Sequence, residues 1–587
     1  MFNKIIVQTV RRLFIAVWVP GAFLLAGCNP GTPDQEAVRS FVTTGNATAL
    51  SASEFNALTP EQQYAVANKL YATFYRGIPV DEFFDIQAEG SMTNLVRRQP
   101  NFLADTRQAL NRNLSPDARL SLKQEIGLFS DDTPIYGDDD LFQFTTNRNA
   151  NTTTLPRQIP LAQIVEFPIS RDLYIEWMTY FLANTIMFSP ALEMESTDAK
   201  DATFVYNFLR NNIRNGVTVQ NTVRAFLGTQ SRWRVSRSAE NHALEAYELY
   251  LGLFDTEEDS RKGGIACRDW KLTSESEQYQ MMRSGEPNTE YQRILDNYYV
   301  RDCADLYNVI VSHPLFIPRV TEVISNYFFA EMDAATRQNF VRDVVAANPQ
   351  TFEDIFTAIL FSREYLLNSE RPMWFEENFF GTLHRLRWSV DRNQGNLGGR
   401  VLRELTEYSW SPLYMRNMGN ATMEYKIGRT PNVPMDAMSF SSQTKAMREQ
   451  VLVNNQNGWR GGDYSNNTKG FRGLLYDTAA RENTPGELST VRRPEVVQMT
   501  AAEFVDYLFM SSLRRRATDD EQSALIDLMR NEDDGDGLNL FYTNDLGVLT
   551  LRPNNNWVIN DATQVVFDYV SRLPEFYYHR SVSAGGV

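Results

Sequence analysis

The spacing of apolar side chains along the chain predicts helices over most of its length. The stretch "TPEQQYAVANKLYATFYRG" is a clear case, because its apolar residues recur every three or four positions and form one face of a helix. Thr59 and Pro60 suit the start of this helix, and Gly77 is expected to end it. The stretch after Ser115 begins in the same way, and residues 170–188 are apolar enough to lie at the centre of a helical core.

Strands are predicted to be rare, because stretches of alternating β-branched residues are few and there is no regular series of hairpin turns. Five long polar stretches are instead expected to be connections, which in compact domains either serve a function or pack on the surface. They are residues 131–160, 256–290, 388–400, 454–473 and 531–558. The predicted fold class is therefore mostly α, a multi-domain or repetitive body of helical hairpins with long surface loops.

Two segments share an order of elements that indicates an internal repeat. Residues 323–367 and 504–579 each begin with a helix, continue through a polar turn into a second helix, and close with a helix that ends on glutamate and an aromatic residue. Asp333 and Thr518 are the expected caps of the second helices, and residues 204–233 form a third, partial copy. Either the similarity is a chance likeness among amphipathic helices, or the body consists of stacked helical hairpins that share a core.

The first thirty residues have the layout of an export signal. The basic residues Lys4, Arg11 and Arg12 precede an apolar run from Leu13 to Leu25, and small residues precede Cys28. The run is shorter than the roughly 20 apolar residues of a membrane-spanning helix. The sequence "RRLFI" also resembles a twin-arginine export motif, and ordinary n-region charge is the alternative.

Leu25-Ala26-Gly27-Cys28 resembles the lipobox of bacterial lipoproteins. In that family the cysteine sulfur receives a diacylglycerol, the signal is removed before the cysteine, and the new amino group is usually acylated. The resemblance implies that Cys28 carries acyl chains such as palmitate, which together anchor a protein stably to a membrane. Asn29 follows the cysteine, which by analogy with enteric bacteria implies the outer membrane, on its periplasmic or cell-surface face. The alternative is a plain export signal followed by an unrelated cysteine.

These patterns divide the chain into six parts. They are a lipoprotein signal peptide at 1–27, a tether at 28–50, an N-terminal helical region at 51–165, a central helical domain at 166–380, a loop-rich region at 381–500 and a C-terminal helical repeat at 501–587.

A second resemblance concerns residues 160–580. The segments "AILFSREYLL", "LHRLRWSVDR", "FRGLLYDTAARENTP" and "EFVDYLFMSSLRRRATDDE" follow one another in this order. This order is similar to that in large exported helical proteins of unknown function from planctomycetes, myxobacteria and marine proteobacteria. The resemblance implies a helical fold and export, and no reaction. Many of those proteins carry a c-type cytochrome domain, whereas this chain contains no C-x-x-C-H sequence and so cannot attach a c-type haem covalently.

Composition and charge restrict the classes of partner that the protein is expected to bind. Hydrophobic residues make up 43% of the chain and aromatic residues 12%, which is enough for packed cores. Residues 1–27 carry three positive charges and no negative one, so their removal changes the net charge from −16 to −19. An acidic balance argues against nucleic acid as a partner, since nucleic-acid affinity comes largely from Lys and Arg. The membrane contact is therefore expected to come from the lipid anchor.

Cys267 and Cys303 are the two cysteines besides Cys28. An even pair in an exported chain predicts one disulfide, and two buried free thiols are the alternative. Neither cysteine has a histidine or another cysteine nearby in the sequence, which argues against a metal site.

Catalytic motifs are absent from the sequence. The four histidines, His242, His313, His384 and His579, are scattered, and there is no nucleophile elbow, P-loop or dinucleotide fingerprint. They are expected to have structural roles. In "NEDDGDGLN", Asp534 and Asp536 match part of a Ca²⁺-binding loop, although Thr543 stands where the bidentate acid is expected; a solvated acidic loop is the alternative. No cofactor other than this Ca²⁺ is expected.

The stretch "NNQNGWRGGDYSNNTKGFRG" at 454–473 is the candidate recognition loop. It combines aromatic side chains that can stack on a ligand, guanidinium groups that donate hydrogen bonds, and glycines that permit close approach. The candidate ligand-binding residues are Trp459, Arg460, Asp463, Tyr464, Phe471 and Arg472. The alternative is a surface loop whose aromatic side chains pack back on the body.

These observations favour a non-enzymatic role. We expect a lipid-anchored envelope protein that acts as a structural or interaction component, a scaffold or assembly subunit with envelope protein partners. The alternative is an enzyme or binding protein that acts on envelope polysaccharide or peptidoglycan, with carboxylates such as Glu364, Glu575 or Asp463 in acid–base roles. A solute-binding lipoprotein would instead have two α/β lobes, and the scarcity of strands argues against it.

The lipobox generates a direct prediction. In protein purified from membranes, the N-terminal peptide should begin at Cys28 and carry the added mass of its acyl chains, measured by mass spectrometry. An unmodified cysteine, or cleavage at another position, would contradict the anchor.

Overall fold

The computed structural model describes residues 41–387 and 499–582, with gaps inside both ranges. The gaps are residues 87–91, 93, 127–128, 131–132, 135–154, 188–198, 237, 276–277, 284–287, 330, 531–540, 547 and 552–565. The chain consists of two units, Met1–Phe41 and Val42–Val587. The second unit contains all of the elements described below. It begins at Val42, within residues 28–50, which were expected to form the tether.

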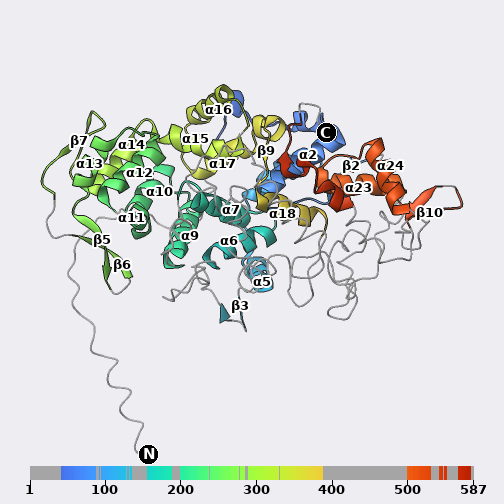
Figure 1. The fold of residues 1–587 in the computed structure, drawn as a ribbon, viewed down its shortest axis with the longest axis horizontal. Helices are drawn as coiled ribbons and strands as arrows, with labels where there is room; N and C mark the ends of the chain where they lie inside the picture. The colour runs from blue at the N-terminus through green and yellow to red at the C-terminus, as the bar shows by residue number, and fades with distance from the viewer. Residues whose placement is uncertain are drawn as a thin grey trace, which may run out of the picture. The chain divides into compact units, whose positions relative to one another are not determined.

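Most of the described residues are helical, which confirms the predicted fold class (Figure 1). The α-helices are α1 (Ala52–Asn56), α2 (Pro60–Thr73), α3 (Val80–Phe83), α4 (Phe102–Leu110), α5 (Pro116–Ile126), α6 (Leu155–Glu166), α7 (Arg171–Asn184), α9 (Ala199–Arg214), α10 (Val219–Leu227), α11 (Gln230–Ser236), α12 (Ala239–Leu251), α13 (Glu257–Ala266), α14 (Cys303–Ser312), α15 (Phe316–Phe328), α16 (Ala334–Ala346), α17 (Phe352–Leu360), α18 (Phe375–Arg385), α23 (Ala501–Leu513) and α24 (Asp519–Arg530). Short 3₁₀ turns form η1 (Gly45–Ala47) and η9 (Pro574–Tyr577), and η3 (Glu364–Asn368) is a π-helix.

The strands in the described part of the chain form small antiparallel pairs, in agreement with the expected scarcity of strands. The pairs are β1 (Phe84–Asp85) with β2 (Val96–Arg97), β3 (Phe129–Ser130) with β4 (Thr133–Pro134), β5 (Trp270–Glu275) with β6 (Gln278–Arg283), β7 (Gln292–Ile294) with β8 (Tyr298–Val300), β10 (Phe541–Thr543) with β11 (Leu549–Leu551), and β9 (Arg371–Pro372) with β12 (Tyr578–His579).

Helix α2 begins as predicted but ends earlier. The Thr59 hydroxyl accepts a hydrogen bond from the Gln62 backbone N–H, and the Gln62 side chain accepts one from the Thr59 N–H, so that a capping box starts the helix. The helix ends at Thr73, and the expected role of Gly77 as its terminator is wrong. Gly77 instead allows close packing on α18, because a Cβ at this position would lie 2.2 Å from the Gly381 carbonyl oxygen.

Helix α7 lies at the centre of the core, as its apolar sequence predicted. Its residues from Asp172 to Asn184 are all buried, and the helix packs against α4, α6 and α9. The Phe181 ring lies 5.5 Å from Phe328 and 5.0 Å from Phe356, between centroids. Aromatic rings from α7, α15 and α17 therefore pack directly against one another in the core.

Three of the expected polar connections contain secondary structure. Residues 131–160 include β4 and the start of α6, residues 256–290 include helix α13 and the hairpin β5–β6, and residues 531–558 include β10 and β11. Helix α13 was not expected, because the polar composition of residues 256–290 suggested a connection; it contains Gly263 and Gly264. They lie against α12, where a Cβ on Gly263 would be 2.8 Å from the Ala243 Cβ. The absence of a side chain at these glycines allows α13 to pack closely against α12.

The two segments of the proposed repeat have the same order of elements. The first contains the C-terminal part of α15, then α16, α17 and most of η3, and the second contains most of α23, then α24, the helical residues 566–570, η9 and β12, with the β10–β11 hairpin inserted. Asp333 caps α16 and Thr518 caps α24, each accepting from the backbone N–H three residues ahead. Strand β9, which follows the first segment, pairs with β12 at the end of the second.

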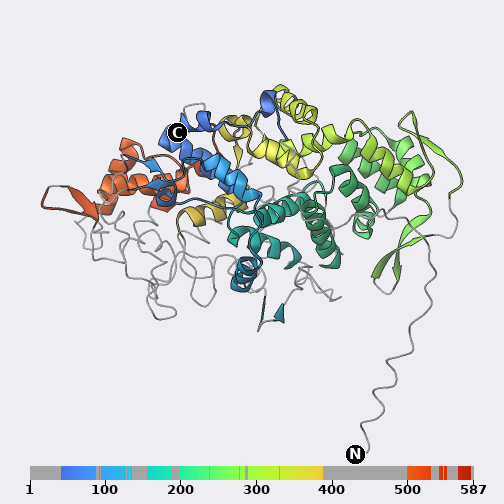
Figure 2. The same cartoon turned by 180° about the vertical axis from the view of Figure 1, so that it is seen from behind.

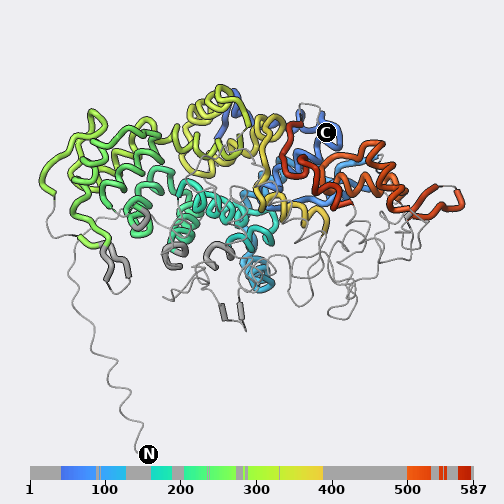
Figure 3. The backbone as a smooth tube through the Cα atoms, in the orientation of Figure 1, coloured from blue at the N-terminus to red at the C-terminus, as the bar shows by residue number. Residues whose placement is uncertain are grey.

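The two ends of the second unit pack against helices far away in sequence. Near the N-terminal end, Leu50 donates its backbone N–H to the Phe361 carbonyl at 2.9 Å, and the Asn46 N–H donates to the Asp343 carboxylate beside α16 at 2.9 Å. At the C-terminal end, β12 and the following residues lie beside α2 (Figures 2 and 3). The Val582 N–H donates to the Leu367 carbonyl at 2.8 Å.

A buried ion pair joins the segments that meet beside α2. Two nitrogens of the Arg371 guanidinium donate to the Glu377 carboxylate at 2.8 and 2.6 Å, and these side chains are 1% and 0% exposed. Arg371 also donates to the Tyr365 hydroxyl at 3.1 Å, and the His579 Nε2 lies 3.5 Å from Glu377. Burial alone would raise the pKa of Glu377, but the charge and hydrogen bonds of Arg371, with a contribution from His579, lower it to about 2.

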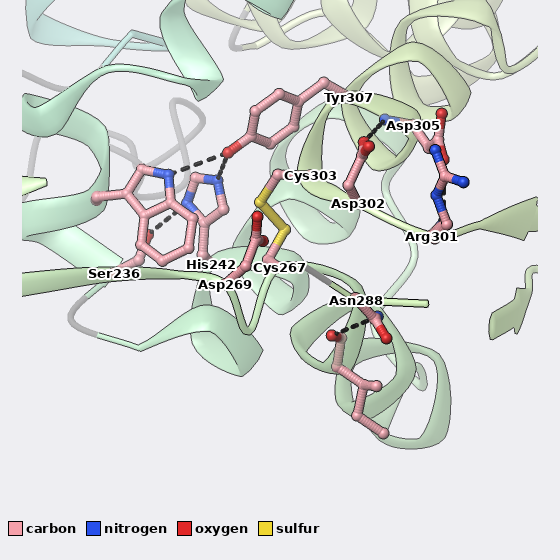
Figure 4. The surroundings of a disulfide bond; sticks show 12 residues. Ser236, His242, Cys267, Asp269, Asn288, Arg301, Asp302, Cys303, Asp305 and Tyr307 are labelled. Carbon is pink, nitrogen blue, oxygen red and sulfur yellow. Dashed lines mark hydrogen bonds between the residues drawn. A yellow bond between two sulfur atoms is a disulfide. The ribbon is translucent and has the colours of Figure 1, made fainter. Parts of the chain in front are cut away.

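A disulfide joins Cys267, which follows α13, to Cys303, the first residue of α14 (Figure 4). Beside it, the His242 Nε2 lies 2.9 Å from the Tyr307 hydroxyl and its Nδ1 lies 3.2 Å from the Ser236 hydroxyl. Burial, followed by the charge of Arg232, lowers the pKa of His242 well below its usual range. Ser236 and His242 are both buried, so this polar cluster has a structural role in the core.

Removal of the disulfide should destabilise the protein. Replacement of both cysteines by alanine frees a loop with a sequence separation of 36 residues in the unfolded chain. The chain-entropy relation gives a loss of about 3–4 kcal/mol. Urea unfolding of the variant and of the oxidised wild type measures this loss, and equal midpoints would contradict it.

Stability should also fall as the pH is lowered. Burial and the charge of Arg371 lower the pKa of His579 to about 3, so between pH 3 and 6.5 the unfolded chain binds a proton that the folded protein does not. This contribution is present above pH 6.5 and is lost as the pH falls toward 3, by a few kcal/mol. Glu377 adds a loss of the same sign below pH 4.5.

Urea unfolding at several pH values between 7 and 4 measures this effect. The slope of unfolding free energy against pH should be shallower in His579→Gln. His313→Gln, at a less buried position near the end of α14, is the control and should change the slope less. An unchanged slope in His579→Gln would contradict the assignment.

Candidate functional site

An open groove lies between α15 and α16 and extends to the end of α12. It has a volume of about 700 Å³. Its lining residues are Leu251, Gly252, Leu315, Pro318, Arg319, Glu322, Asn326, Ala334, Arg337, Gln338, Val341, Arg342 and Val345. We refer to it as the α15–α16 groove.

Helical periodicity explains how α16 forms one wall. Ala334, Arg337, Val341 and Val345 recur every three or four residues and therefore lie on one face of the helix. The two buried residues of α16, Phe340 and Val344, belong to a neighbouring face that packs on the protein. The helix thus has an apolar stripe wider than its own packing requires.

Apolar and charged side chains share the groove. Leu315, which is 41% exposed, lines it together with Pro318 and Leu251 at the α12 and α15 side. Three arginines and one glutamate complete the lining, so its formal charge is positive. They are Arg319, Arg337, Arg342 and Glu322. Such a surface suits a ligand that is apolar on one side and acidic on the other.

The arginines are held in place by near neighbours. The Arg319 Nη1 lies 2.9 Å from Glu322, and the Arg337 guanidinium donates to the Met332 carbonyl at 2.7 Å. Arg342 lies 3.0 Å from Asp343, but its side chain is 68% exposed. Arg319 and Arg337 therefore have local partners that restrain them, whereas Arg342 remains largely exposed.

Gly252 fixes the wall at the end of α12. Its φ of +69° ends the helix in the left-handed conformation, and a Cβ here would lie 3.2 Å from the Arg319 Cδ and Nε. The Arg319 Nε is buried and has no hydrogen-bond partner among the described residues. Backbone and guanidinium are thus in direct contact, and a larger residue at 252 would displace Arg319.

Most of the site residues predicted from the sequence lie outside the described residues. They are Cys28, the six candidate ligand-binding residues Trp459, Arg460, Asp463, Tyr464, Phe471 and Arg472, and the candidate Ca²⁺ ligands Asp534 and Asp536.

The two described carboxylates of the alternative enzyme hypothesis have structural partners. Glu364 accepts a hydrogen bond from the Asn368 side chain at 2.9 Å. Glu575 accepts from Arg515 and lies 2.9 Å from Arg580. Both carboxylates therefore already serve local contacts.

The remaining histidines are also engaged in local contacts. The His384 Nε2 lies 2.8 Å from the Arg76 guanidinium, and the His313 Nδ1 accepts from the Leu315 N–H at 3.2 Å. Within the described part of the chain, no three His, Cys, Asp or Glu side chains are grouped so that they could hold a metal ion. Likewise, none of its helices is long and apolar enough to cross a membrane.

The sequence reasoning missed the α15–α16 groove, although a signal for it exists. Val341 and Val345 follow the buried Phe340 and Val344 by one position each, so α16 carries two apolar stripes side by side. A helix that needs one stripe for its own core and carries two is a candidate for docking.

Comparison of the chain with protein-family models, curated proteins and solved structures finds no match.

Proposed function

We propose that this chain is a lipid-anchored envelope protein that acts as an interaction component, and that the α15–α16 groove receives an acidic amphipathic helix of a partner protein. The observation that carries the proposal is the combination of an open apolar surface with three arginines in one groove. Laying the apolar face of a helix into a hydrophobic groove is a common mode of recognition. The apolar contact supplies affinity, and the charges select an acidic partner.

The dimensions of the groove support a helix of about three turns. Along α16 the lining runs from Ala334 to Val345, which is about 16 Å at the rise of an α-helix. A partner helix of this length presents apolar residues at positions i, i+3 or i+4, and i+7. Acidic residues on its flanks would then lie beside Arg337 and Arg342.

The proposed anchor is joined to the second unit by a short segment of chain. Residues 28–41 separate Cys28 from the body and can span at most about 50 Å when fully extended. Asn46 is bound to Asp343, the neighbour of the groove residue Arg342. The start of the body and the groove are therefore adjacent, and a partner in the same envelope layer is within reach.

Site-specific photo-crosslinking in the native membrane tests this function. A photoreactive residue at Gln338, which is exposed and lines the groove, should give one discrete adduct of higher mass. The same residue at Ala335, exposed on α16 but outside the lining, is the matched control and should not give it. Mass spectrometry of the adduct identifies the partner.

Charge reversal in the groove provides the second half of the test. Arg337→Glu should reduce the Gln338 adduct roughly tenfold or more, because like charges then oppose the partner. Arg261→Glu, at an exposed position on α13, is the control and should leave it unchanged. Equal adducts from both α16 positions, or no adduct at Gln338, would contradict the proposal.

A further inference from the structure

A narrow pocket of about 30 Å³ lies where α2, the end of α23 and the C-terminal segment meet. Its lining residues are Ala65, Lys69, Leu513, Arg514, Arg515, Glu575, His579, Arg580 and Val582. A volume of this size holds about two water molecules or one small polyatomic group. We refer to it as the cation pocket, because its lining contains four cationic side chains and one acidic side chain. The cationic ones are Lys69, Arg514, Arg515 and Arg580, and the acidic one is Glu575.

Lys69 is a buried amine without a carboxylate partner. It is 2% exposed, its Nζ donates to the Ser369 carbonyl at 2.6 Å, and it lies 5.2 Å from the centroid of the Tyr365 ring. Among the described residues, none of the carboxylates lies within ion-pair distance of it. Burial, followed by repulsion from Arg371 and Arg514, lowers the pKa of Lys69 well below its usual range.

Arg514 is the second buried cation in this position. It is 7% exposed and donates to the Tyr578 carbonyl at 3.1 Å and to the Met373 sulfur at 3.4 Å, and no described carboxylate pairs with it. It ends α23 with a φ of +65°, a conformation that glycine adopts at lower cost. Burial and repulsion from Arg385 lower the pKa of Arg514 to about 9.

The one acid of the lining is committed to other cations. Glu575 accepts from Arg515 through Oε1 and pairs with Arg580 through Oε2 at 2.9 Å. Arg515 also donates two hydrogen bonds to Glu521, at 2.7 and 2.8 Å. Glu575 therefore forms no ion pair with Lys69 or Arg514 and, like Glu370 and Glu377, acts on these cations only at longer range. Buried charges in folded proteins are ordinarily paired, since an ion removed from water without a counter-ion is strongly unfavourable.

We infer that the cation pocket binds one small oxyanion, a carboxylate or phosphoryl group, between Lys69 and Arg514. An ammonium group and a guanidinium group supply charge-assisted hydrogen bonds to such oxygens. The size of the pocket admits the anionic group alone, so a larger ligand would insert only its charged end. This inference does not rest on the α15–α16 groove, which is formed by other helices.

Thermal unfolding of the full-length chain with inorganic phosphate, acetate and sodium chloride at equal ionic strength tests the inference. Phosphate or acetate should raise the Tm above the chloride control in a concentration-dependent manner, because a ligand that binds only the folded state stabilises it. Isothermal titration with the same two anions gives the affinity. An effect of phosphate alone identifies a phosphoryl group, and an effect of acetate alone identifies a carboxylate.

Variants of the pocket connect the effect to these residues. Lys69→Met and Arg514→Gln should weaken anion binding by roughly tenfold to a hundredfold, the contribution of a hydrogen bond to a charged group. Without anion, Lys69→Met should unfold at the same or a higher temperature than the wild type, since it removes a buried amine whose desolvation is unfavourable. A purely structural Lys69 would give a lower Tm instead.

Two further variants keep the test decisive if the buried ones do not fold. Arg580→Gln, with a side chain that is 47% exposed at the pocket rim, should fold and bind the anion more weakly. Arg261→Gln, exposed on α13, should bind like the wild type. Stabilisation that chloride matches, or anion binding that Lys69→Met, Arg514→Gln and Arg580→Gln all retain, would overturn the inference.

Discussion

The ion pair between Arg371 and Glu377 is the interaction on which the junction of α18, β9 and the C-terminal strand β12 depends. Transfer of both charges out of water is costly, so the pair is tolerable only when its oxygens and N–H groups are satisfied. Glu377 accepts from Arg371 and from the Trp374 N–H at 2.9 Å, while the Arg371 guanidinium lies 4.4 Å from the Trp374 ring centroid. Helix α18, strand β9 and the C-terminal strand β12 are thereby fixed relative to one another. The cation pocket lies beside this arrangement, because His579 of β12 both lines the pocket and contacts Glu377.

The features that could be predicted correctly from the sequence are those that depend on residues close together in the chain. Caps such as Thr59 and Asp333 were found because a hydroxyl or carboxylate beside a free N–H acts within four residues. The role of Gly77 was predicted wrongly and that of Gly263 was not foreseen, since both depend on packing against another helix of the fold. Lys69 was missed for the same reason: it lies on a helix buried on nearly all sides, and its neighbours come from residues 369, 514 and 579.

The groove and the cation pocket place positive charge on an acidic protein. The chain carries a net charge of −16, which on the whole disfavours an acidic partner. For the acidic helix that we propose, the arginines of the groove make one region attractive, while the net charge acts against docking elsewhere. Under this proposal, selectivity comes from the contrast between a local positive patch and an acidic chain.

The pairing of β9 with β12 has a consequence for the order of events during folding. Pro372 is opposite Tyr578, and His579 and Val582 complete the lining of the pocket that contains Lys69. The junction therefore cannot close until residues 578–582 reach residues that lie about 200 and 500 positions earlier in the chain. Contacts so distant in sequence form slowly, so the pairing of β12 is expected to be a late step of folding.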